Sequence, residues 1–152
     1  MSTDKRPPSF NFTYNREVRT YEVDFQQIVH NAIYFYFFEE ARIEYLKNLG
    51  FSIKGEISIE GSQFVIVHNE ADYVEPARLG DALNILVRIS RIGRSSFTYE
   101  LKIVREDGTH ICSGRTTVVT IDKNSGRPKS IPEVLRKTVE TFEGAAIDAD
   151  PF

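Results

Sequence analysis

The residues best suited to chemistry lie close together between positions 21 and 31. This segment contains two carboxylates, Glu22 and Asp24, and a histidine, His30, and it leads into a predicted helix that starts at Asn31. The first N–H groups of a helix lack partners within the helix and carry the positive end of its dipole, so they can polarise a carbonyl group or hold an oxyanion. Asp24 can then act as a nucleophile or as a general base. The spacing therefore indicates chemistry at a carbonyl group.

A structural interpretation of the same residues is also open. Short carboxylate side chains often cap turns, and a histidine close to a helix start is commonly solvated. On that interpretation Asp24 caps the turn and His30 faces water. Spacing alone does not separate the two interpretations.

The other polar clusters predict structure more than chemistry. His68, Glu70 and Asp72 alternate onto one face of a predicted strand, but one histidine without a fourth ligand is a weak metal site. Cys112 alternates with apolar neighbours and is expected in the core. We therefore expect no metal and no cofactor.

A predicted helix over residues 31–49 positions the chemical segment. Its apolar stripe consists of residues three or four positions apart: Tyr34, Phe38, Ala41, Tyr45 and Leu49. Asn31 is a favoured N-cap residue, and Gly50 stands where a C-cap glycine belongs. The first two turns are apolar nearly all round, so this end is expected to be buried against a sheet or a partner subunit.

The rest of the chain mainly follows the two-residue period of strands. We expect strands at 14–23, 63–74, 82–91, 95–105 and 110–121, a loop at 122–132 and a second helix at 133–142. Asp107-Gly108 is typical of a type I′ hairpin turn, in which both central residues have positive φ. Four consecutive strands without helices imply an antiparallel sheet. The sequence thus predicts an α+β domain with one apolar helix on a curved sheet.

The composition is that of one globular domain. The 152 residues fit a single core, with a flexible arm at 1–12, the domain at 13–143 and a flexible tail at 144–152. No apolar run approaches the roughly 20 residues of a membrane-spanning helix, and the N-terminus lacks the apolar region of a secretory signal. A single cysteine cannot form an internal disulfide, so a cytoplasmic location is expected. The net charge of −3 argues against a nucleic-acid surface.

A resemblance to a known family adds to this interpretation. The run Asp24-x-x-x-Ile28-Val29-x-Asn31-Ala32-x-Tyr34 is followed by residues 38–46 and Leu49-Gly50, and then by Tyr73-x-x-Pro76-Ala77, Gly80-Asp81, Gly93-Arg94-Ser95, Gly114 and Asp122-x-x-x-Gly126-Arg127-Pro128. Over about residues 16–143 the sequence resembles the 4-hydroxybenzoyl-CoA thioesterase-like branch of the hotdog-fold acyl-CoA thioesterases. The resemblance implies a hotdog fold, in which an antiparallel sheet wraps around a long central helix, and sites at the junction of two protomers.

The resemblance also implies roles for single residues. The family's catalytic carboxylate, the second acid of an Asp-x-Asp pair, falls on Asp24, and the first acid falls on Glu22. The backbone amide that polarises the thioester carbonyl falls on Asn31. Gln27 replaces a usual glycine, where a side chain penalises positive φ. Gln27 and His30 are expected to position a water or to hydrogen-bond the carboxylate.

Basic residues near a predicted strand end are the candidates for binding the CoA phosphates. Arg91, Arg94 and Ser95, with Arg88 nearby, lie around the turn between two predicted strands. Charge-assisted donors at such a turn suit phosphate groups, and a role in solubility is the alternative.

These observations predict an acyl-CoA thioesterase that hydrolyses its substrate to free CoA and a carboxylic acid. The expected partners are acyl-CoA and further copies of the chain, in a homodimer or homotetramer with shared active sites. One alternative is a non-catalytic hotdog module that binds an acyl thioester or a partner, which the Gln27 departure favours. A weaker alternative is an enoyl-thioester hydratase, because the Asp-x-Asn-Pro-x-His pattern of such enzymes is one residue shorter than the segment from Asp24 to His30.

Overall fold

The computed structural model describes residues 9–144 and residue 147. The elements are, in order, β1 (Phe12–Glu17), the 3-10 turn η1 (Thr20–Glu22), α1 (Ile33–Asn48), β2 (Ser58–Ile59), β3 (Ser62–Tyr73), β4 (Ala82–Ile92), β5 (Ser96–Arg105), β6 (His110–Asp122) and α2 (Glu133–Glu143). Most of the expected arm and tail, namely residues 1–8, 145–146 and 148–152, lies outside the described residues. Within the described part, β1 begins at Phe12, the last residue of the expected arm.

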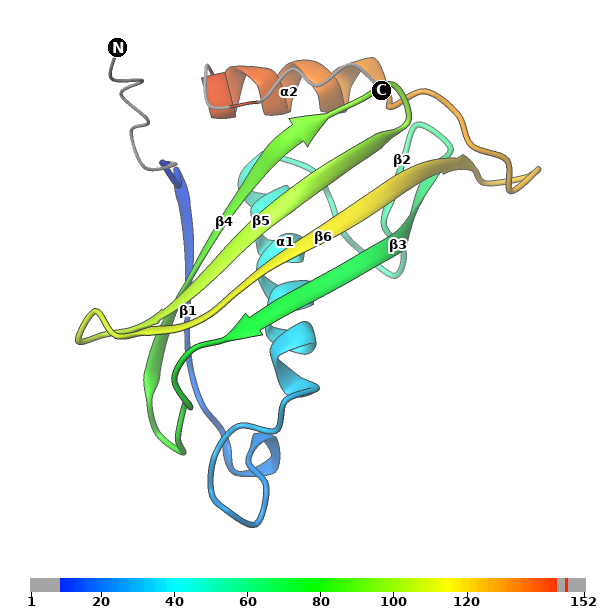
Figure 1. Ribbon diagram of the computed structural model, residues 1–152. Coiled ribbons are helices and arrows are strands. Elements are labelled where there is room, and N and C mark those ends of the chain that lie inside the picture. Colours follow the sequence, from blue (N-terminus) through cyan, green and yellow to red (C-terminus); the bar gives the residue numbers. More distant parts are fainter. Residues whose placement is uncertain (1–8, 145–146, 148–152) are drawn as a thin grey trace.

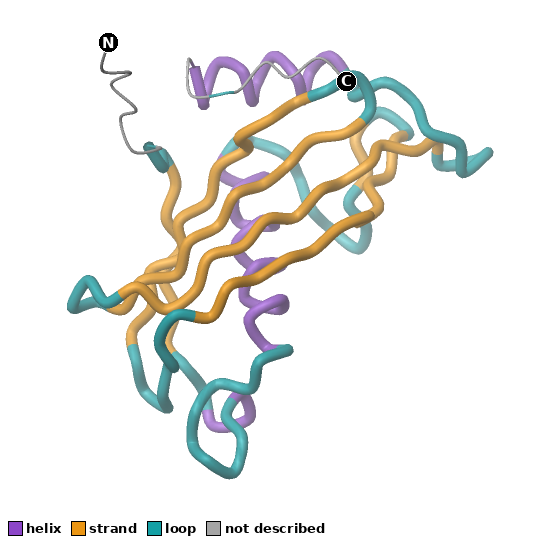
Figure 2. The backbone as a smooth tube through the Cα atoms, in the orientation of Figure 1, coloured by secondary structure: helices purple, strands orange, loops and turns teal. Residues whose placement is uncertain are grey.

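The strands form one antiparallel sheet in the order β1-β4-β5-β6-β3-β2. The sheet curls around α1, and α2 lies across one end of it (Figures 1 and 2). This arrangement confirms the predicted α+β hotdog architecture, with one long helix against a curved sheet. None of the described helices is both long and apolar enough to cross a bilayer.

Helix α1 supplies much of the core. Its predicted stripe is buried at Tyr34, Phe38, Ala41 and Tyr45. Gly50 follows the helix with φ of 97°, and its N–H donates to the Lys47 carbonyl at 3.0 Å, as a C-terminal glycine should. The apolar first turns are only partly buried within one chain, because Tyr36 remains 61% exposed.

The predicted N-cap at Asn31 is wrong. The cap residue is Ala32, which offers no capping side chain, and α1 begins at Ile33. His30 takes over the role, because its Nδ1 accepts the Ala32 N–H at 3.1 Å and its carbonyl accepts the Ile33 N–H at 2.9 Å. His30, and not Asn31, therefore supplies the acceptors for the Ala32 and Ile33 N–H groups.

Close packing of α1 on the sheet depends on Gly114 in β6. A Cβ atom at this position would lie 2.4 Å from Cε2 of Phe38 and 2.6 Å from the Glu70 carbonyl oxygen. Since real Cβ atoms do not approach neighbours so closely, only glycine lets the Phe38 ring lie directly against the sheet.

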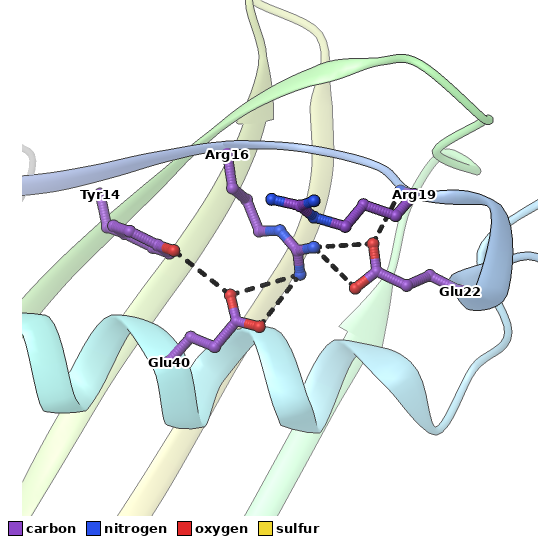
Figure 3. Close-up of polar contacts among 5 residues, drawn as sticks. All are labelled: Tyr14, Arg16, Arg19, Glu22 and Glu40. Carbon is purple, nitrogen blue, oxygen red and sulfur yellow. Dashed lines mark hydrogen bonds and ion pairs between the residues drawn. The ribbon is translucent and has the colours of Figure 1, made fainter.

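The strand predicted at 14–23 is too long. Strand β1 ends at Glu17, and the chain then tightens into η1, whose Glu22 carboxylate accepts the Arg19 N–H at 2.8 Å. The same carboxylate pairs with Arg16, which also reaches Glu40 on α1 (Figure 3). A side chain that caps a turn and pairs with the preceding strand therefore overrides the local strand preference.

The type I′ turn predicted at Asp107-Gly108 is also wrong. Only Gly108 has positive φ there, at 90°. Arg105 and Thr109 close the hairpin, with the Arg105 N–H donating to the Thr109 carbonyl and the Gly108 N–H donating to the Arg105 carbonyl, both at 2.8 Å. The loop has one residue more than a type I′ turn, so only its last residue needs the left-handed conformation.

Candidate active site

Asp24 opens a hairpin of residues 24–28. Its N–H donates to the Ile28 carbonyl at 2.9 Å, and its carbonyl accepts the Gln27 N–H at 2.9 Å. Oδ1 of Asp24 accepts the Gln26 N–H at 2.8 Å. The backbone of the turn thereby fixes one carboxylate oxygen, and Oδ2 has no hydrogen-bond partner within residues 9–144 and 147.

Gln27 occupies the strained position of this hairpin. Its φ is 64°, and the backbone bonding is that of the 105–109 hairpin, where Gly108 stands at the equivalent position. The expectation that this position favours glycine is consistent with its positive φ. The Gln27 side chain does not line the cavity around Asp24.

Backbone contacts tie the hairpin to the fold. The Val29 N–H donates to the Ala77 carbonyl at 2.9 Å, and the His30 N–H donates to the Glu22 carbonyl at 3.1 Å. The Ala77 N–H in turn donates to the Tyr34 hydroxyl at 3.2 Å. The segment that carries Asp24 is therefore held by both the helix and the loop that follows β3.

The peptide that follows Asn31 is held at both ends. The Tyr73 hydroxyl donates to the Asn31 carbonyl at 2.9 Å, and the Ala32 N–H donates to Nδ1 of His30. An Nδ1 atom that accepts a hydrogen bond is unprotonated, so a neutral His30 carries its proton on Nε2. The Asn31 N–H itself has no acceptor among the described residues, and Asn31 directly precedes the cap residue of α1, at the positive end of the helix.

A cavity of about 480 Å³ brings these groups together. Its wall includes Asp24, His30, Asn31, Tyr34 and Tyr73. The two tyrosine rings lie 5.3 Å apart, and burial raises the pKa of both hydroxyls, so both stay protonated and uncharged. Within one chain Asp24 and Asn31 thus line the same cavity.

Sequence reasoning misses the role of two residues in this wall. It places Tyr34 in the helix stripe and in the family resemblance, and Tyr73 in the resemblance, but gives neither a role in the site. The signal for Tyr73 is its place at the end of a predicted strand, three residues before Pro76. Its contact with Asn31 spans 42 positions in the chain and has no local signature.

Glu22, the expected first acid of the pair, does not line this cavity. It is 5% exposed and accepts two hydrogen bonds from Arg16 Nη2, at 2.7 and 2.6 Å. The Arg16 guanidinium carbon lies 4.1 Å from the centre of the Phe37 ring. The described contacts of Glu22 are those of a buried ion pair that joins β1 to η1.

Arg91, Arg94 and Ser95 lie at the other end of the sheet from Asp24. Strand β4 starts at Ala82, which pairs with Glu17 close to η1, and it ends at Ile92 after a run of roughly 33 Å (Figure 1). The Ser95 carbonyl accepts the Thr120 N–H at 2.7 Å. One chain therefore does not bring this turn to the cavity around Asp24, and the neighbouring Arg88 is engaged by Glu100.

The remaining polar candidates are His68, Glu70 and Cys112. Nε2 of His68 lies 3.6 Å from Oε1 of Glu70, and the described residues contain no group of three potential metal ligands. Cys112 is fully buried, and burial raises the pKa of its thiol to about 12. Cys112 is therefore a core residue with little thiolate character at neutral pH.

Comparisons with known proteins identify the family. A family model described as "Thioesterase-like superfamily" matches residues 18–139. The acyl-CoA thioester hydrolase YbgC of Escherichia coli is 30% identical over 120 residues, covering 78% of this chain and 89% of the relative. The long-chain acyl-CoA thioesterase FadM of Escherichia coli is 30% identical over 125 residues, covering 82% and 93%.

Solved structures show the same fold. A thioesterase from Thermus thermophilus, complexed with coenzyme A and Zn, superimposes with a TM-score of 0.76 at 31% identity, covering 89% of this chain and 96% of that one. A 1,4-dihydroxy-2-naphthoyl-CoA thioesterase from Synechocystis gives a TM-score of 0.78 at 22% identity, covering 84% and 94%. The second likeness concerns the fold alone.

Proposed function

The chain belongs to the thioesterase-like superfamily, and on that premise we propose that it is an acyl-CoA thioester hydrolase that releases free CoA and a carboxylic acid. The observation that carries the proposal is a cavity lined by both Asp24 and Asn31, whose N–H has no acceptor among the described residues. A carboxylate and a backbone donor close to a helix N-terminus suit hydrolysis of a thioester.

In the proposed reaction the thioester carbonyl oxygen accepts the Asn31 N–H, which stabilises the negative charge that develops on it. Oδ2 of Asp24 either attacks the carbonyl carbon, giving a mixed anhydride that water then opens, or removes a proton from an attacking water. The C–S bond breaks in either route, and the CoA sulfur leaves as a thiolate that takes up a proton. Label from ¹⁸O-water in Asp24 identifies the anhydride route with water attack at the Asp24 carbonyl carbon, because general-base catalysis leaves both Asp24 oxygens in place.

Neighbouring residues have positioning roles in this proposal. His30 and Tyr73 hold the peptide after Asn31 from its two ends, which orients the N–H that binds the carbonyl. Gln27 shapes the turn that presents Asp24 without entering the cavity.

The CoA end of the site requires a second copy of the chain. Strand β2 covers only Ser62 and Gln63 of β3, and the edge beyond them exposes Val65, Ile66 and Val67. An open apolar edge is a place for another strand to pair. We therefore infer a homodimer in which two β3 strands pair antiparallel, and a homotetramer forms if two dimers associate.

This pairing accounts for the separation of the predicted site residues. Strand β3 begins beside the 93–95 turn, since Phe64 pairs with Thr120 and the Thr120 N–H binds the Ser95 carbonyl. It ends at Tyr73 in the cavity around Asp24. Antiparallel pairing would bring the start of one β3 to the end of the other, and so Arg91, Arg94 and Ser95 of one copy to the Asp24 cavity of its partner.

The test is release of free thiol from a panel of aliphatic and aromatic acyl-CoAs. Asp24→Asn should lower kcat by about 100-fold or more, the usual effect of removing a catalytic acid or base. Asp107→Asn is the matched control, because Asp107 also caps a hairpin through its Oδ1 but lies in a different turn.

The outcomes separate the candidate functions. Equal turnover of Asp24→Asn and wild type, with folding intact, would remove Asp24 from the mechanism. Acyl-CoA binding without thiol release by the wild-type protein would identify a non-catalytic binding module.

A further inference from the structure

A second cavity lies between α1 and the inner face of the sheet. Its volume is about 140 Å³, and it shares no wall residue with the cavity around Asp24. Most of the wall is apolar, with side chains from α1, β3, β5, β6 and α2 that include Ile43, Leu46, Phe64, Phe97, Val118 and Leu135. Glu39, Arg42 and Tyr99 complete it.

Arg42 is the unusual member of this wall. It is 8% exposed, its Nη1 donates to Oγ1 of Thr116 at 3.1 Å, and its guanidinium carbon lies 5.9 Å from the centre of the Tyr99 ring. Within residues 9–144 and 147, no carboxylate lies at ion-pair distance from it. A charge removed from water normally has a carboxylate partner, because its desolvation is costly.

The wall offers hydrogen-bond donors without matching acceptors. In the described part of the chain, the Tyr99 hydroxyl and the Nε and Nη2 groups of Arg42 have no hydrogen-bond partner. Burial raises the pKa of Tyr99, so its hydroxyl keeps its proton. Glu39 precedes Arg42 by three residues, but its side chain is exposed and does not pair with the guanidinium. An occupant that supplies an anionic acceptor would satisfy these donors.

Stability alone does not account for a charge at this position. Oγ1 of Thr116 also donates to Oδ1 of Asn69 at 2.7 Å, so Thr116 keeps a partner without Arg42. Replacement of a buried charge by an apolar side chain of similar volume is often neutral or stabilising. A methionine at position 42 would thus be expected to fold at least as well.

We propose that this second cavity binds the carboxylate end of a small organic acid, with the carboxylate on Arg42 and the apolar part against Leu46, Phe97 and Val118. The volume suits one ring or a short aliphatic chain, since a cavity of about 150 Å³ in another protein accepts benzene. The carboxylate belongs either to a free acid or to the far end of an acyl group.

The position of the cavity links it to the proposed reaction. Phe64 and Ile66 in its wall belong to the open edge of β3. In the antiparallel dimer proposed above, this end of β3 lies beside the partner's catalytic cavity. That link rests on the proposed function, whereas binding of a free acid does not.

Binding is measured with 4-fluorobenzoate and with 4-fluorobenzyl alcohol, its neutral analogue, by ¹⁹F NMR titration of the full-length protein. The wild type should bind the acid at least tenfold more tightly than the alcohol, as a charge-assisted hydrogen bond predicts. Arg42→Met should abolish this preference and leave the affinity for the alcohol unchanged.

Further variants identify the site. Glu39→Gln should tighten acid binding two- to threefold, because it removes a like charge near the carboxylate. Val118→Phe should abolish binding of both compounds by filling the cavity. Asp24→Asn should leave both affinities unchanged, because Asp24 lines the other cavity.

Hydrolysis of adipoyl-CoA and hexanoyl-CoA distinguishes the two sources of the carboxylate. If the carboxylate belongs to the acyl group, Arg42→Met should lower kcat/KM at least tenfold for adipoyl-CoA and leave kcat/KM for hexanoyl-CoA unchanged. If the carboxylate belongs to a free acid, Arg42→Met should change kcat/KM equally for both thioesters. Equal binding of the fluorinated acid and alcohol by the wild type, or an unchanged preference in Arg42→Met, would overturn the proposal. Acid binding that depends on Arg42, in a protein that hydrolyses no thioester, would support this site and refute only the proposed function.

Discussion

Two hairpins of the same backbone geometry carry different residues at their left-handed position, Gln27 in one and Gly108 in the other. A side chain in this conformation costs roughly 1–2 kcal/mol, and glycine loses roughly 0.5–1 kcal/mol through its greater unfolded-state freedom. We therefore expect Gln27→Gly to raise the free energy of unfolding by about 0.5–1 kcal/mol in urea titrations. Gly108→Gln, the reciprocal change, should lower the free energy of unfolding. A lower free energy of unfolding in Gln27→Gly would contradict the inference that the Gln27 backbone is strained.

In the proposed reaction Tyr73 acts through its hydrogen bond to Asn31. Tyr73→Phe removes the hydroxyl that binds the Asn31 carbonyl but keeps the ring against Tyr34. The loss of one hydrogen bond should lower kcat about five- to tenfold with little change in KM. Steady-state kinetics on one acyl-CoA measure both constants.

The control for Tyr73 is Tyr21→Phe, since Tyr21 is 75% exposed and absent from the wall of the catalytic cavity. It should retain the wild-type kcat. A rise in KM without a fall in kcat in Tyr73→Phe would assign the hydroxyl to substrate binding.

At the scale of single residues, the sequence identifies what local spacing encodes. Asp24 and Asn31 stand out because a carboxylate lies seven positions before a predicted helix start. Both line the cavity, and their catalytic roles stay predictions. The Tyr73 contact could not be predicted, because it forms only when the end of β3 folds beside the start of α1.

Helix α2 is joined to α1 by a buried carboxylate. Oε1 of Glu143 accepts the Tyr45 hydroxyl at 2.6 Å, whereas Oε2 is buried without a partner among the described residues. Burial raises the pKa of Glu143, against the opposing effect of the Tyr45 hydrogen bond. The folded protein therefore holds this proton to higher pH than the unfolded chain does, and the stabilisation is lost as pH rises through the folded pKa.

Glu143→Gln removes this titration and keeps an oxygen that can accept from Tyr45. The variant should become more stable than wild type as the pH rises from 4 to 7. The difference between their free energies of unfolding should reach about 1–3 kcal/mol, which is the cost of an unsatisfied buried group. Chemical denaturation at several pH values measures the trend. Glu140→Gln, an exposed change in the same helix, should show no such trend, and a parallel trend would exclude Glu143 as the cause.

At the scale of elements, the periodic patterns predicted the helices and strands well, but the residues at which they begin and end were predicted poorly. The stripe of α1 and the four long strands follow from burial on one face. The end of β1 and the cap of α1 depend instead on Glu22 and His30, whose partners the period does not reveal. Contacts of single side chains thus decide the ends.

The proposed dimer makes a sharp prediction for mixtures of inactive variants. If Asp24 of one copy works with Arg94 of its partner, Asp24→Asn and Arg94→Ala are each impaired, but a heterodimer of the two has one site with both residues intact. Refolding equal amounts together should restore about a quarter of the wild-type activity, because about half of the dimers are mixed and each has one good site of two.

The matched control is refolding each variant alone, which should restore nothing. If both residues served the same site from one chain, every site in the mixture would lack one of them. No recovery on mixing would then be observed.

At the scale of the whole molecule, the fold was predictable because pattern and topology agree, whereas for the proposed assembly the sequence offered only an apolar surface. The sequence marks the start of α1 as too apolar for a solvated helix. The sequence could not reveal that Val65, Ile66 and Val67 lie at an open edge of β3. The order and lengths of the strands in the sheet decide which strand segment stays uncovered.

The open edge of β3 also bears on how the protein behaves before it assembles. A newly made chain presents unpaired backbone groups beside exposed valine and isoleucine side chains, and these groups do not distinguish a second copy from any other extended polypeptide. Formation of the proposed dimer and aggregation would therefore compete for one strand. The outcome depends on how quickly a folded copy is met, so the yield of soluble protein is governed by the rates of synthesis and association as well as by the stability of the fold.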